Sequence, residues 1–218
     1  MKSLFTSIFF LNILFSLSAC GQKIKRIASD KHLKESELSK YSVATFAAGC
    51  FWHEEAMFES IKGVKEAISG YAGGTLKNPN YEDVETGRTG HTEAVNVYYD
   101  SSVITYPTLL KLFFAGQDPT QVNGQGPDWG TQYRSIAFYR NDKEKKLIED
   151  YIKAIQPNYK NRIAVQVAPF TKLWLAEGYH QDYIEKTPGN TYVQNVSIPE
   201  IKRLQKEYKQ FIKPDHLY

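Results

Sequence analysis

The chain has 218 residues, of which 42% are hydrophobic and 14% aromatic, and its 27 basic side chains nearly balance 24 acidic ones for a net charge of +3. This near balance excludes a dedicated nucleic-acid surface, which needs a clear basic excess. The length suffices for one domain with a hydrophobic core. Two cysteines are too few for a disulfide framework.

The N-terminal residues have the pattern of an export signal. Lys2 is followed by an apolar run at 4–15, which is shorter than the roughly 20 residues of a spanning helix and typical of a signal peptide. The sequence Leu-Ser-Ala-Cys-Gly at 17–21 resembles the lipobox of bacterial lipoproteins. We expect removal of residues 1–19, lipidation of Cys20, and an exported protein anchored to a membrane on its periplasmic side. An ordinary secretory signal cleaved nearby is the alternative.

Residues 20–40 are polar and mixed in charge, and we interpret them as a lipid-anchored, solvated tether that is partly helical at most. One folded domain is expected at 41–213.

Strands and helices alternate along this domain. In chain order, hydrophobic periodicity and turn residues predict a strand at 43–48, a helix at 51–62, strands at 64–74 and 92–99, a helix at 106–115, a strand at 135–139, a helix at 143–155, a strand at 163–167, and helices at 177–186 and 198–211. Long polar loops at 75–90 and 116–133 interrupt the series. Such interleaving predicts a two-layer sandwich of the α/β or α+β class.

Cys50 lies at the junction between the first strand and the first helix, where Gly49 permits a sharp turn. A helix N-terminus favours the thiolate and can lower a cysteine pKa from about 8.5 to roughly 3.5–7.5. A buried structural cysteine is the alternative, because cysteine is often buried. Two large aromatic residues directly after the thiol, Phe51 and Trp52, favour a nucleophile.

Three further stretches, at 78–81, 90–94 and 126–135, carry proton-donating or proton-relaying side chains. Each could also be structural, since loop tyrosines are commonly packing residues and a glutamate on a strand is usually solvated. His91 and Glu93 spell the His-x-Glu of zinc deaminases, but that site needs paired cysteines downstream, and none follows Cys50. The five histidines show no metal spacing, so we expect no metal.

In combination, four motifs resemble the A-type peptide methionine sulfoxide reductase family from residue 43 to about 208. The motifs are Gly-Cys-Phe-Trp at 49–52 with Glu55, Tyr-Ala-Gly-Gly at 71–74, Gly-His-Thr-Glu-Ala-Val at 90–95, and Gly-Thr-Gln-Tyr-Arg-Ser at 130–135. The resemblance implies an α+β, ferredoxin-like two-layer sandwich of mixed sheet and helices. It also implies reduction of the S epimer of methionine sulfoxide, free or in proteins.

The resemblance further implies a role for each matching residue. Cys50 attacks the sulfoxide sulfur and becomes a sulfenic acid, and Glu93 protonates the sulfoxide oxygen. Phe51 and Trp52 enclose the methyl group. The remaining matches are two phenols that hydrogen-bond the oxygen and a carboxylate that orients water or neighbouring groups: Tyr81, Tyr133 and Asp128.

The chain departs from the family pattern at three points. No cysteine follows Cys50 to resolve the sulfenic acid, so we expect no bound cofactor and an external reductant, either a thioredoxin-like protein or a small thiol. His53 stands where relatives often have a small residue or cysteine; it could lower the thiol pKa when protonated, or be a solvated helix residue. Gln117 replaces an expected histidine, which bears only on fine tuning.

Two other functions stay open at this point. A thiol hydrolase or transferase would pair Cys50 with His91 or His180 as base. A non-enzymatic surface lipoprotein would bind peptides through Trp52, Trp129 and the tyrosines. The partners expected for the reductase are oxidised proteins or peptides, free methionine sulfoxide and a thiol reductant, with no nucleic acid, and the protein is expected to be a monomer.

Overall fold

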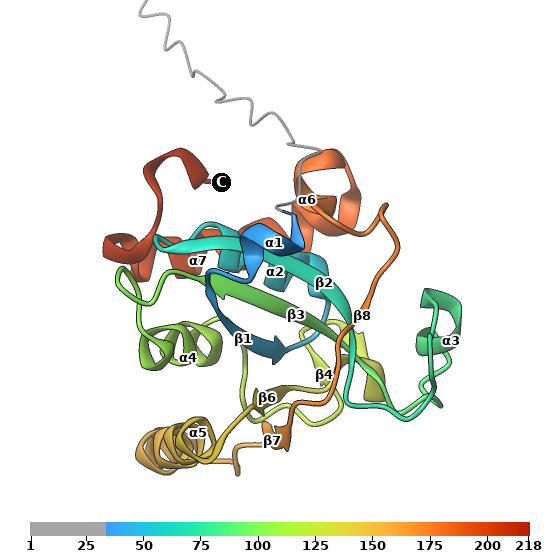
Figure 1. The fold of residues 1–218 in the computed structure, drawn as a ribbon, viewed down its shortest axis with the longest axis horizontal. Helices are drawn as coiled ribbons and strands as arrows, with labels where there is room; N and C mark the ends of the chain where they lie inside the picture. Colours follow the sequence, from blue (N-terminus) through green and yellow to red (C-terminus); the bar gives the residue numbers. More distant parts are fainter. Residues whose placement is uncertain (1–33) are drawn as a thin grey trace, which may run out of the picture.

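The computed structural model describes residues 34–218 (Figure 1). The predictions for the signal peptide at 1–19, for Cys20 and for most of the tether therefore lie outside the described residues. The described end of the tether contains a short helix, α1 (Glu35–Leu38), whose Leu38 side chain is buried. Within the described range, no helix combines the length and apolar character needed to cross a membrane.

A βαββαβ unit forms the centre of the fold. Its elements are β1 (Ser42–Ala47), α2 (Phe51–Glu59), β2 (Val64–Ala72), β3 (Thr92–Tyr99), α4 (Tyr106–Ala115) and β6 (Ile136–Tyr139). The strands lie in the order β6-β1-β3-β2 and all neighbours are antiparallel. This is the ferredoxin-like arrangement, so the predicted α+β class is confirmed.

Two edge strands extend this unit into a six-stranded mixed sheet with the order β7-β6-β1-β3-β2-β8. Strand β7 (Gln166–Pro169) runs parallel to β6, and β8 (Trp174–Leu175) runs antiparallel to β2. In the central pairing, the register runs from Ser42 opposite Tyr99 to Phe46 opposite Val95.

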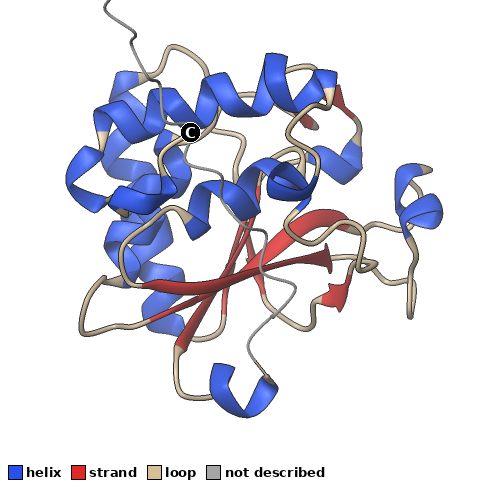
Figure 2. Ribbon diagram, turned by 90° about the horizontal axis from the view of Figure 1, so that it is seen from above, coloured by secondary structure: helices blue, strands red, loops and turns tan. Residues whose placement is uncertain are grey.

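The main core lies between the sheet and the helices, which gather largely on one side of it (Figure 2). At its centre the Phe46 ring stacks on Phe58 and Phe113, with centroids 5.4 and 4.6 Å away. A smaller apolar cluster on the opposite face is covered by Phe170 and Leu173, from the segment that crosses the sheet between β7 and β8 (Figure 1). Helices therefore cover one face of the sheet, and the segment between β7 and β8 covers the other.

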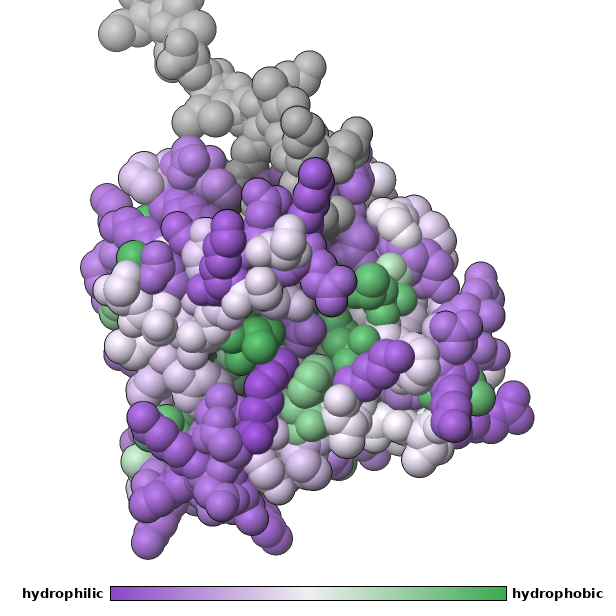
Figure 3. Space-filling model, viewed as in Figure 1, coloured by the Kyte–Doolittle hydropathy of each residue, from purple (hydrophilic) through white to green (hydrophobic). Residues whose placement is uncertain are grey.

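Helix α5 (Asp142–Ile155) lies at the periphery. Its N-terminus is capped by Asn141, whose side chain accepts the Glu144 backbone N–H at 2.9 Å. Ile148 is its buried anchor, while its outward side chains form the strongly hydrophilic surface at the lower left of Figure 3. This amphipathic pattern explains why the helix was predictable.

Two predicted elements differ from the structure for identifiable reasons. The strand predicted at 163–167 begins at Gln166, because the Ile163 and Ala164 N–H groups bond to Gln156 Oε1 and the Pro119 carbonyl instead of a neighbouring strand. The helix predicted at 177–186 is reduced to α6 (Tyr183–Lys186), because Asp182 has a left-handed φ of 52°. The C-terminal prediction divides into α7 (Ile198–Glu207) and a 3-10 turn, Lys209–Phe211.

The sequence patterns missed several short elements, most of them within the predicted loops. These are α3 (Tyr81–Glu85), the two-stranded hairpin β4 (Gly124–Gln125) and β5 (Asp128–Trp129), the edge strand β8, 3-10 turns at Thr131–Tyr133, Gln156–Asn158 and Pro214–His216, and a π-helical turn at Val193–Ser197. Several of them carry side chains of the site described next.

Candidate active site

The junction between β1 and α2 holds Cys50 at the N-cap of the helix. Gly49 has a φ of +69°, and a Cβ atom there would lie 2.7 Å from Gln125 Cβ. The turn therefore requires glycine for both its conformation and the close approach of the β4–β5 hairpin. The Gly49 N–H donates to the Tyr133 carbonyl at 3.1 Å, which ties the loop after β5 to the cysteine turn.

Glu93, on β3, reaches the same turn. Its Oε2 accepts the Phe51 backbone N–H at 2.8 Å, so the carboxyl is held at the first turn of α2 beside Cys50. The Glu93 side chain is only 2% exposed, which rules out the alternative that it is a solvated residue on a strand. Burial raises the pKa of Glu93 well above its usual range; the Phe51 hydrogen bond opposes this, and the charges of Glu85 and Asp128 add to it. The carboxyl is therefore kept protonated.

The pKa of Cys50 is also raised, which corrects the expectation of a lowered value. Burial is the main cause and the nearby charge of Glu93 is the next, whereas the Trp52 and His53 backbone N–H groups lower the pKa by less. The helix N-terminus thus acts in the expected direction, but desolvation outweighs it. Cys50 is a partly exposed free thiol whose proton is retained in the unliganded enzyme.

Both predicted phenols lie near enough to this carboxyl for its charge to raise their pKa. Tyr133 Oη donates to Glu85 Oε2 at 2.9 Å, and the pKa of Tyr133 is raised by burial and then by the charge of Glu93. Tyr81 begins α3, and its pKa is raised by burial and by the charges of Glu85 and Glu93. The structure therefore brings Tyr81 and Tyr133 to the Glu93 side of Cys50.

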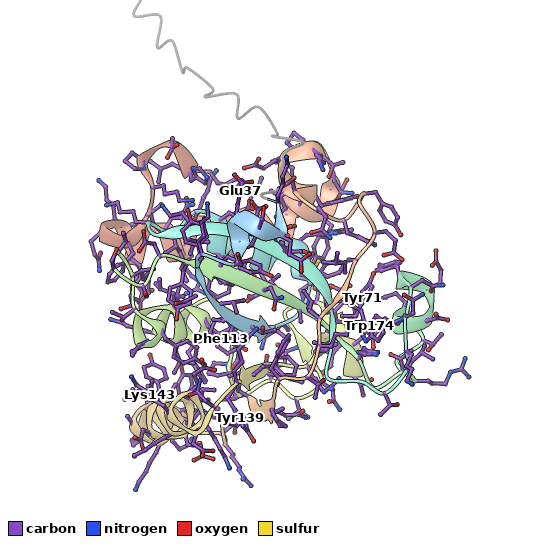
Figure 4. All side chains as sticks on the ribbon, in the orientation of Figure 1. Glu37, Tyr71, Phe113, Tyr139, Lys143 and Trp174 are labelled. Atoms are coloured by element: carbon purple, nitrogen blue, oxygen red, sulfur yellow. The ribbon has the colours of Figure 1, made fainter. Side chains whose placement is uncertain are left out.

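Tyr81 is positioned by Glu177, which sequence reasoning did not identify. Glu177 Oε1 accepts the Tyr81 N–H at 2.9 Å, and its Oε2 accepts the Tyr71 hydroxyl at 2.8 Å. Tyr71 pairs with Trp174 where β8 joins the sheet, and Figure 4 shows the two side chains close together. Glu177 therefore links the α3 loop to the edge of the sheet.

An aromatic wall follows the thiol. The Trp52 ring stacks on Tyr183 with centroids 3.6 Å apart and an interplanar angle of 8°. Trp52 Nε1 donates to His180 Nδ1 at 3.0 Å, and the Phe51 ring lies 5.0 Å from His180. Phe51 is buried and Trp52 is partly exposed. The part of this aromatic wall that solvent reaches is therefore the indole of Trp52, which Tyr183 and His180 hold in place.

Neither histidine of the hydrolase hypothesis is available as a base. His180 Nδ1 accepts from Trp52, and burial lowers the pKa of His180. His91 Nδ1 accepts the Gly74 N–H at 3.1 Å, and its Nε2 lies 2.7 Å from the Leu76 carbonyl. Both rings therefore hold loops in place.

Asp128 contacts a tyrosine that the sequence analysis missed. Tyr192 Oη donates to Asp128 Oδ2 at 2.5 Å. Burial, the charge of Cys50 and hydrogen bonds to Asp128 and Cys50 raise the pKa of Tyr192. Burial also raises the pKa of Asp128.

His53 fits neither sequence interpretation. Its side chain is 7% exposed, and its pKa is lowered to about 4, by burial and then by the charge of Arg203, while the Ser197 backbone opposes the change. It is therefore uncharged at neutral pH and cannot stabilise a thiolate as a cation. His53 and Gln117 line a cavity of about 580 Å³ that also reaches Cys50, Asp128 and Tyr192.

Residues 34–218 contain no group of three or more His, Cys, Asp or Glu side chains arranged to hold a metal ion. A thiol beside a protonated carboxyl and an aromatic wall, on a ferredoxin-like sheet, defines a cysteine-based oxidoreductase. Residues 42–212 match the family model described as peptide methionine sulfoxide reductase. The chain belongs to this family, in its A type, and is an oxidoreductase acting on methionine sulfoxide.

Known relatives agree in sequence and in structure. The peptide methionine sulfoxide reductase MsrA of Pasteurella multocida is 44% identical over 170 residues, covering 78% of this chain and 98% of that protein. The MsrA of Thermus thermophilus is 42% identical over 172 residues, covering 79% and 98%. The structure of methionine sulfoxide reductase A of Corynebacterium diphtheriae superposes with a TM-score of 0.63 at 32% identity, covering 68% of this chain and 76% of that chain. For reduced Mxr1 of Saccharomyces cerevisiae the TM-score is 0.65 at 36% identity, covering 68% and 87%.

Proposed function

We propose that this protein reduces the S epimer of methionine sulfoxide, free and in oxidised exported proteins, through a Cys50 sulfenic acid. The observation that carries the proposal is the buried Glu93 carboxyl, held at the first turn of α2 by the Phe51 N–H at 2.8 Å. A sulfoxide oxygen is a strong hydrogen-bond acceptor, and its sulfur becomes electrophilic once the oxygen is protonated. A proton-bearing carboxyl beside a thiol is what this reaction needs.

The proposed binding mode uses an apolar side and a proton-donating side of Cys50. The methyl group lies against Trp52 and Phe51, because the indole is fixed by its stack on Tyr183 and its bond to His180. The oxygen points toward Glu93 and the hydroxyls of Tyr81 and Tyr133. Only one epimer places both groups correctly while its sulfur faces Cys50, which is the physical basis of the proposed stereospecificity.

The chemical step transfers the oxygen. Glu93 donates its proton to the sulfoxide oxygen, and the Cys50 sulfur attacks the substrate sulfur. The oxygen moves to Cys50 as its bond to the substrate sulfur and the new sulfur–sulfur bond both break, leaving a thioether and Cys50–S–OH. The thiol proton of Cys50 replaces the proton that Glu93 gave up, so the carboxyl is ready for the next turnover. Tyr192, hydrogen-bonded to Asp128, stabilises negative charge on the attacking sulfur.

An external thiol completes the cycle in this proposal. No cysteine follows Cys50 in the sequence, so the sulfenic acid has no resolving partner within the domain. Two thiol groups, from a small molecule or from a thioredoxin-like protein, reduce Cys50 and release water. The protein acts as a monomer, exported after removal of residues 1–19 and held by a lipid on Cys20 at the periplasmic side of a membrane.

The test is an epimer-resolved assay with dithiothreitol as reductant. We expect the wild-type protein to consume methionine (S)-sulfoxide and leave the R epimer unchanged. Cys50→Ser is expected to abolish turnover while keeping the circular dichroism spectrum and melting temperature of the wild type. In single turnover without reductant, mass spectrometry should find one added oxygen on the peptide that contains Cys50. Turnover of the R epimer, or full activity of Cys50→Ser, would refute the proposal.

A further inference from the structure

One of the two phenols at the proposed substrate site already has a partner for its hydroxyl. Tyr133 Oη donates to Glu85 Oε2 at 2.9 Å, and Glu85 is the last residue of α3. A tyrosine hydroxyl carries one proton, and its oxygen can also accept a hydrogen bond. While the proton points to Glu85, Tyr133 cannot donate to the sulfoxide oxygen, which is the role that the proposed function gives it.

The contact between Glu85 and Tyr133 is supported by the backbone around it. Helix α3 stands at the edge of the domain (Figure 1), but its C-terminal end is tied to the 3-10 turn that carries Tyr133. Thr131 Oγ1 donates to the Gly87 carbonyl at 2.8 Å, and Gln132 Nε2 donates to the Glu85 carbonyl at 3.4 Å. These two bonds keep the Glu85 carboxyl within reach of the Tyr133 hydroxyl.

Glu85 lies among other acidic and phenolic groups of the site. The titratable groups that interact with it come from α3, β3, β5 and the 3-10 turn: Tyr81, Glu93, Asp128 and Tyr133. Burial raises the pKa of Glu85; the hydrogen bonds from Tyr133 and Gln132 oppose this, and the charge of Asp128 adds to it. Glu85 is only half-buried, whereas Glu93 is buried and its pKa is raised well above its usual range. Glu85 is therefore the first of these two carboxyls to ionise as the pH rises.

We propose that Glu85 is a positioning residue that sets the direction of the Tyr133 hydroxyl proton. Ionised Glu85 accepts that proton and withholds it from the substrate. Protonated Glu85 has an O–H of its own, which it donates to Tyr133 Oη, so that Tyr133 turns its proton to the sulfoxide oxygen. The two oxygens need not move, because a separation of 2.9 Å suits an O–H···O bond with either group as donor. This inference rests on the proposed function, since it concerns the same sulfoxide site.

Ionisation of Glu85 should therefore weaken sulfoxide binding. Tyr133 makes its bond to the bound sulfoxide before any oxygen transfer, so loss of the bond raises KM while kcat changes less. One neutral hydrogen bond corresponds to a change of about two- to tenfold. We expect the KM of the wild type for methionine (S)-sulfoxide to rise by this factor as the pH passes the pKa of Glu85. This rise lies on the acid side of the loss of activity expected from ionisation of Glu93.

The test measures this KM against pH at saturating dithiothreitol. In Glu85→Leu the hydroxyl has no carboxylate to bond, so at the higher pH we expect KM to fall to the value that the wild type has at the lower pH. Glu85→Gln keeps the size of the side chain but cannot ionise, and its KM should also be independent of pH, which tests the point even if the leucine variant does not fold. The matched control Glu82→Leu removes an acid from an exposed position of the same helix and should keep the pH dependence of the wild type.

A double-mutant cycle separates this effect from the charge of Glu85. Loss of that charge also lowers the pKa of Glu93, but this influence does not pass through the Tyr133 hydroxyl. In a Tyr133→Phe background, Glu85→Leu should therefore leave the KM for the sulfoxide unchanged.

Three results would overturn the assignment. One is a wild-type KM that stays constant until the activity loss caused by Glu93. Another is a higher KM in Glu85→Leu than in the wild type, which would show that the carboxylate holds Tyr133 in its productive orientation. A third is an effect of Glu85→Leu on KM that persists in Tyr133→Phe, which would assign the effect to charge alone. A failure of the proposed function differs from all three, since the wild type would then not reduce the S epimer at any pH.

Discussion

At the scale of single residues, desolvation decides the protonation of the site. Cys50 is placed where a helix N-terminus should ionise it, yet burial and the neighbouring Glu93 raise its pKa. Burial also raises the pKa of Glu93, although that carboxyl accepts a backbone N–H. Both groups therefore hold their protons in the unliganded enzyme. In the proposed mechanism, attack on the substrate is therefore coupled to proton transfer, and the protonated resting thiol is protected from indiscriminate oxidation.

The pH dependence of kcat/KM tests the role of Glu93. In the proposed mechanism the protonated carboxyl is the active form, so activity should persist through neutral pH and fall as the pH rises through the raised pKa of Glu93. Glu93→Gln keeps the shape but has no proton to give, and we expect kcat/KM to fall by about 10²–10⁴. The residual activity should rise with pH as Cys50 ionises. An alkaline decrease that persists in Glu93→Gln would contradict this assignment.

At the scale of elements, α2 positions the reactive thiol but also buries acidic side chains, which lowers the stability of the fold when they ionise. Its first turn positions the thiol and the aromatic wall, and its next residues bury Glu54, neither of whose carboxyl oxygens has a hydrogen-bond partner within the described part of the chain. Burial and then Glu200 raise the pKa of Glu54 well above its usual range. Burial, followed by Asp182 and other acidic neighbours, raises the pKa of Glu59 to about 8.

These acids predict a stability that falls with increasing pH. In the unfolded chain they ionise near their ordinary pKa, while in the folded protein they keep their protons to higher pH. The native state then binds more protons, so the free energy of unfolding decreases from about pH 4.5 until the folded pKa is passed, near pH 8 for Glu59.

Glu54→Gln should therefore stabilise the protein at pH 8 by about 1–3 kcal/mol, because it removes a buried carboxyl without hydrogen bonds, and it should have little effect at pH 4.5. Urea denaturation at the two pH values measures the difference. Glu149→Gln, at a solvent-exposed position of α5, is the control and should change little. A Glu54→Gln protein that is less stable at pH 8 would show that the carboxylate is satisfied.

The turn before α2 gives a second prediction at this scale. In Gly49→Ala the alanine must adopt a positive φ, and its Cβ would approach Gln125 Cβ to 2.7 Å. We expect a loss of about 1–2 kcal/mol from the backbone conformation alone, and a lower kcat because Cys50 moves. Gly178→Ala is the control, since a Cβ there meets nothing within 4 Å. Thermal unfolding and steady-state rates test both, and equal effects at the two positions would contradict the argument.

At the scale of the whole molecule, the site is assembled from distant parts of one domain. Strand β3, the loop of α3, the β4–β5 hairpin and the C-terminal segment all converge on the N-terminus of α2. In the sequence, every group that we place at the reaction falls within the range from Cys50 to Tyr192. The catalytic unit is therefore the folded domain, and the anchor that we propose contributes location only.

Removal of residues 1–33 tests this separation. We expect the shortened protein to keep the kcat/KM of the full chain for methionine (S)-sulfoxide within about twofold, because all groups in the proposed mechanism remain; a twofold change is only about 0.4 kcal/mol. In cells the full chain should fractionate with membranes, and Cys20→Ser should release it with its activity intact. A shortened protein that folds but is tenfold less active would place part of the site in the removed segment.

The sequence by itself determined the features that depend on residues close together in the chain. Alternation predicted β3 at 92–99, and helical spacing with an early proline predicted α4 at 106–115, both with the observed bounds. The motifs were sufficient to identify the family. These predictions succeed because strand and helix periodicity, turn residues and contiguous motifs all depend on near neighbours in the chain.

Only the tertiary structure decided which distant groups meet and which protons they keep. The contacts of Glu177 with Tyr81 and Tyr71 join residues 96 and 106 positions apart, and no local pattern predicts such pairs. The same holds for the burial of His53 and the contact of Tyr192 with Asp128. The direction of the Cys50 pKa shift was predicted wrongly because desolvation depends on every segment around the thiol, whereas the helix N-terminus is visible in the sequence.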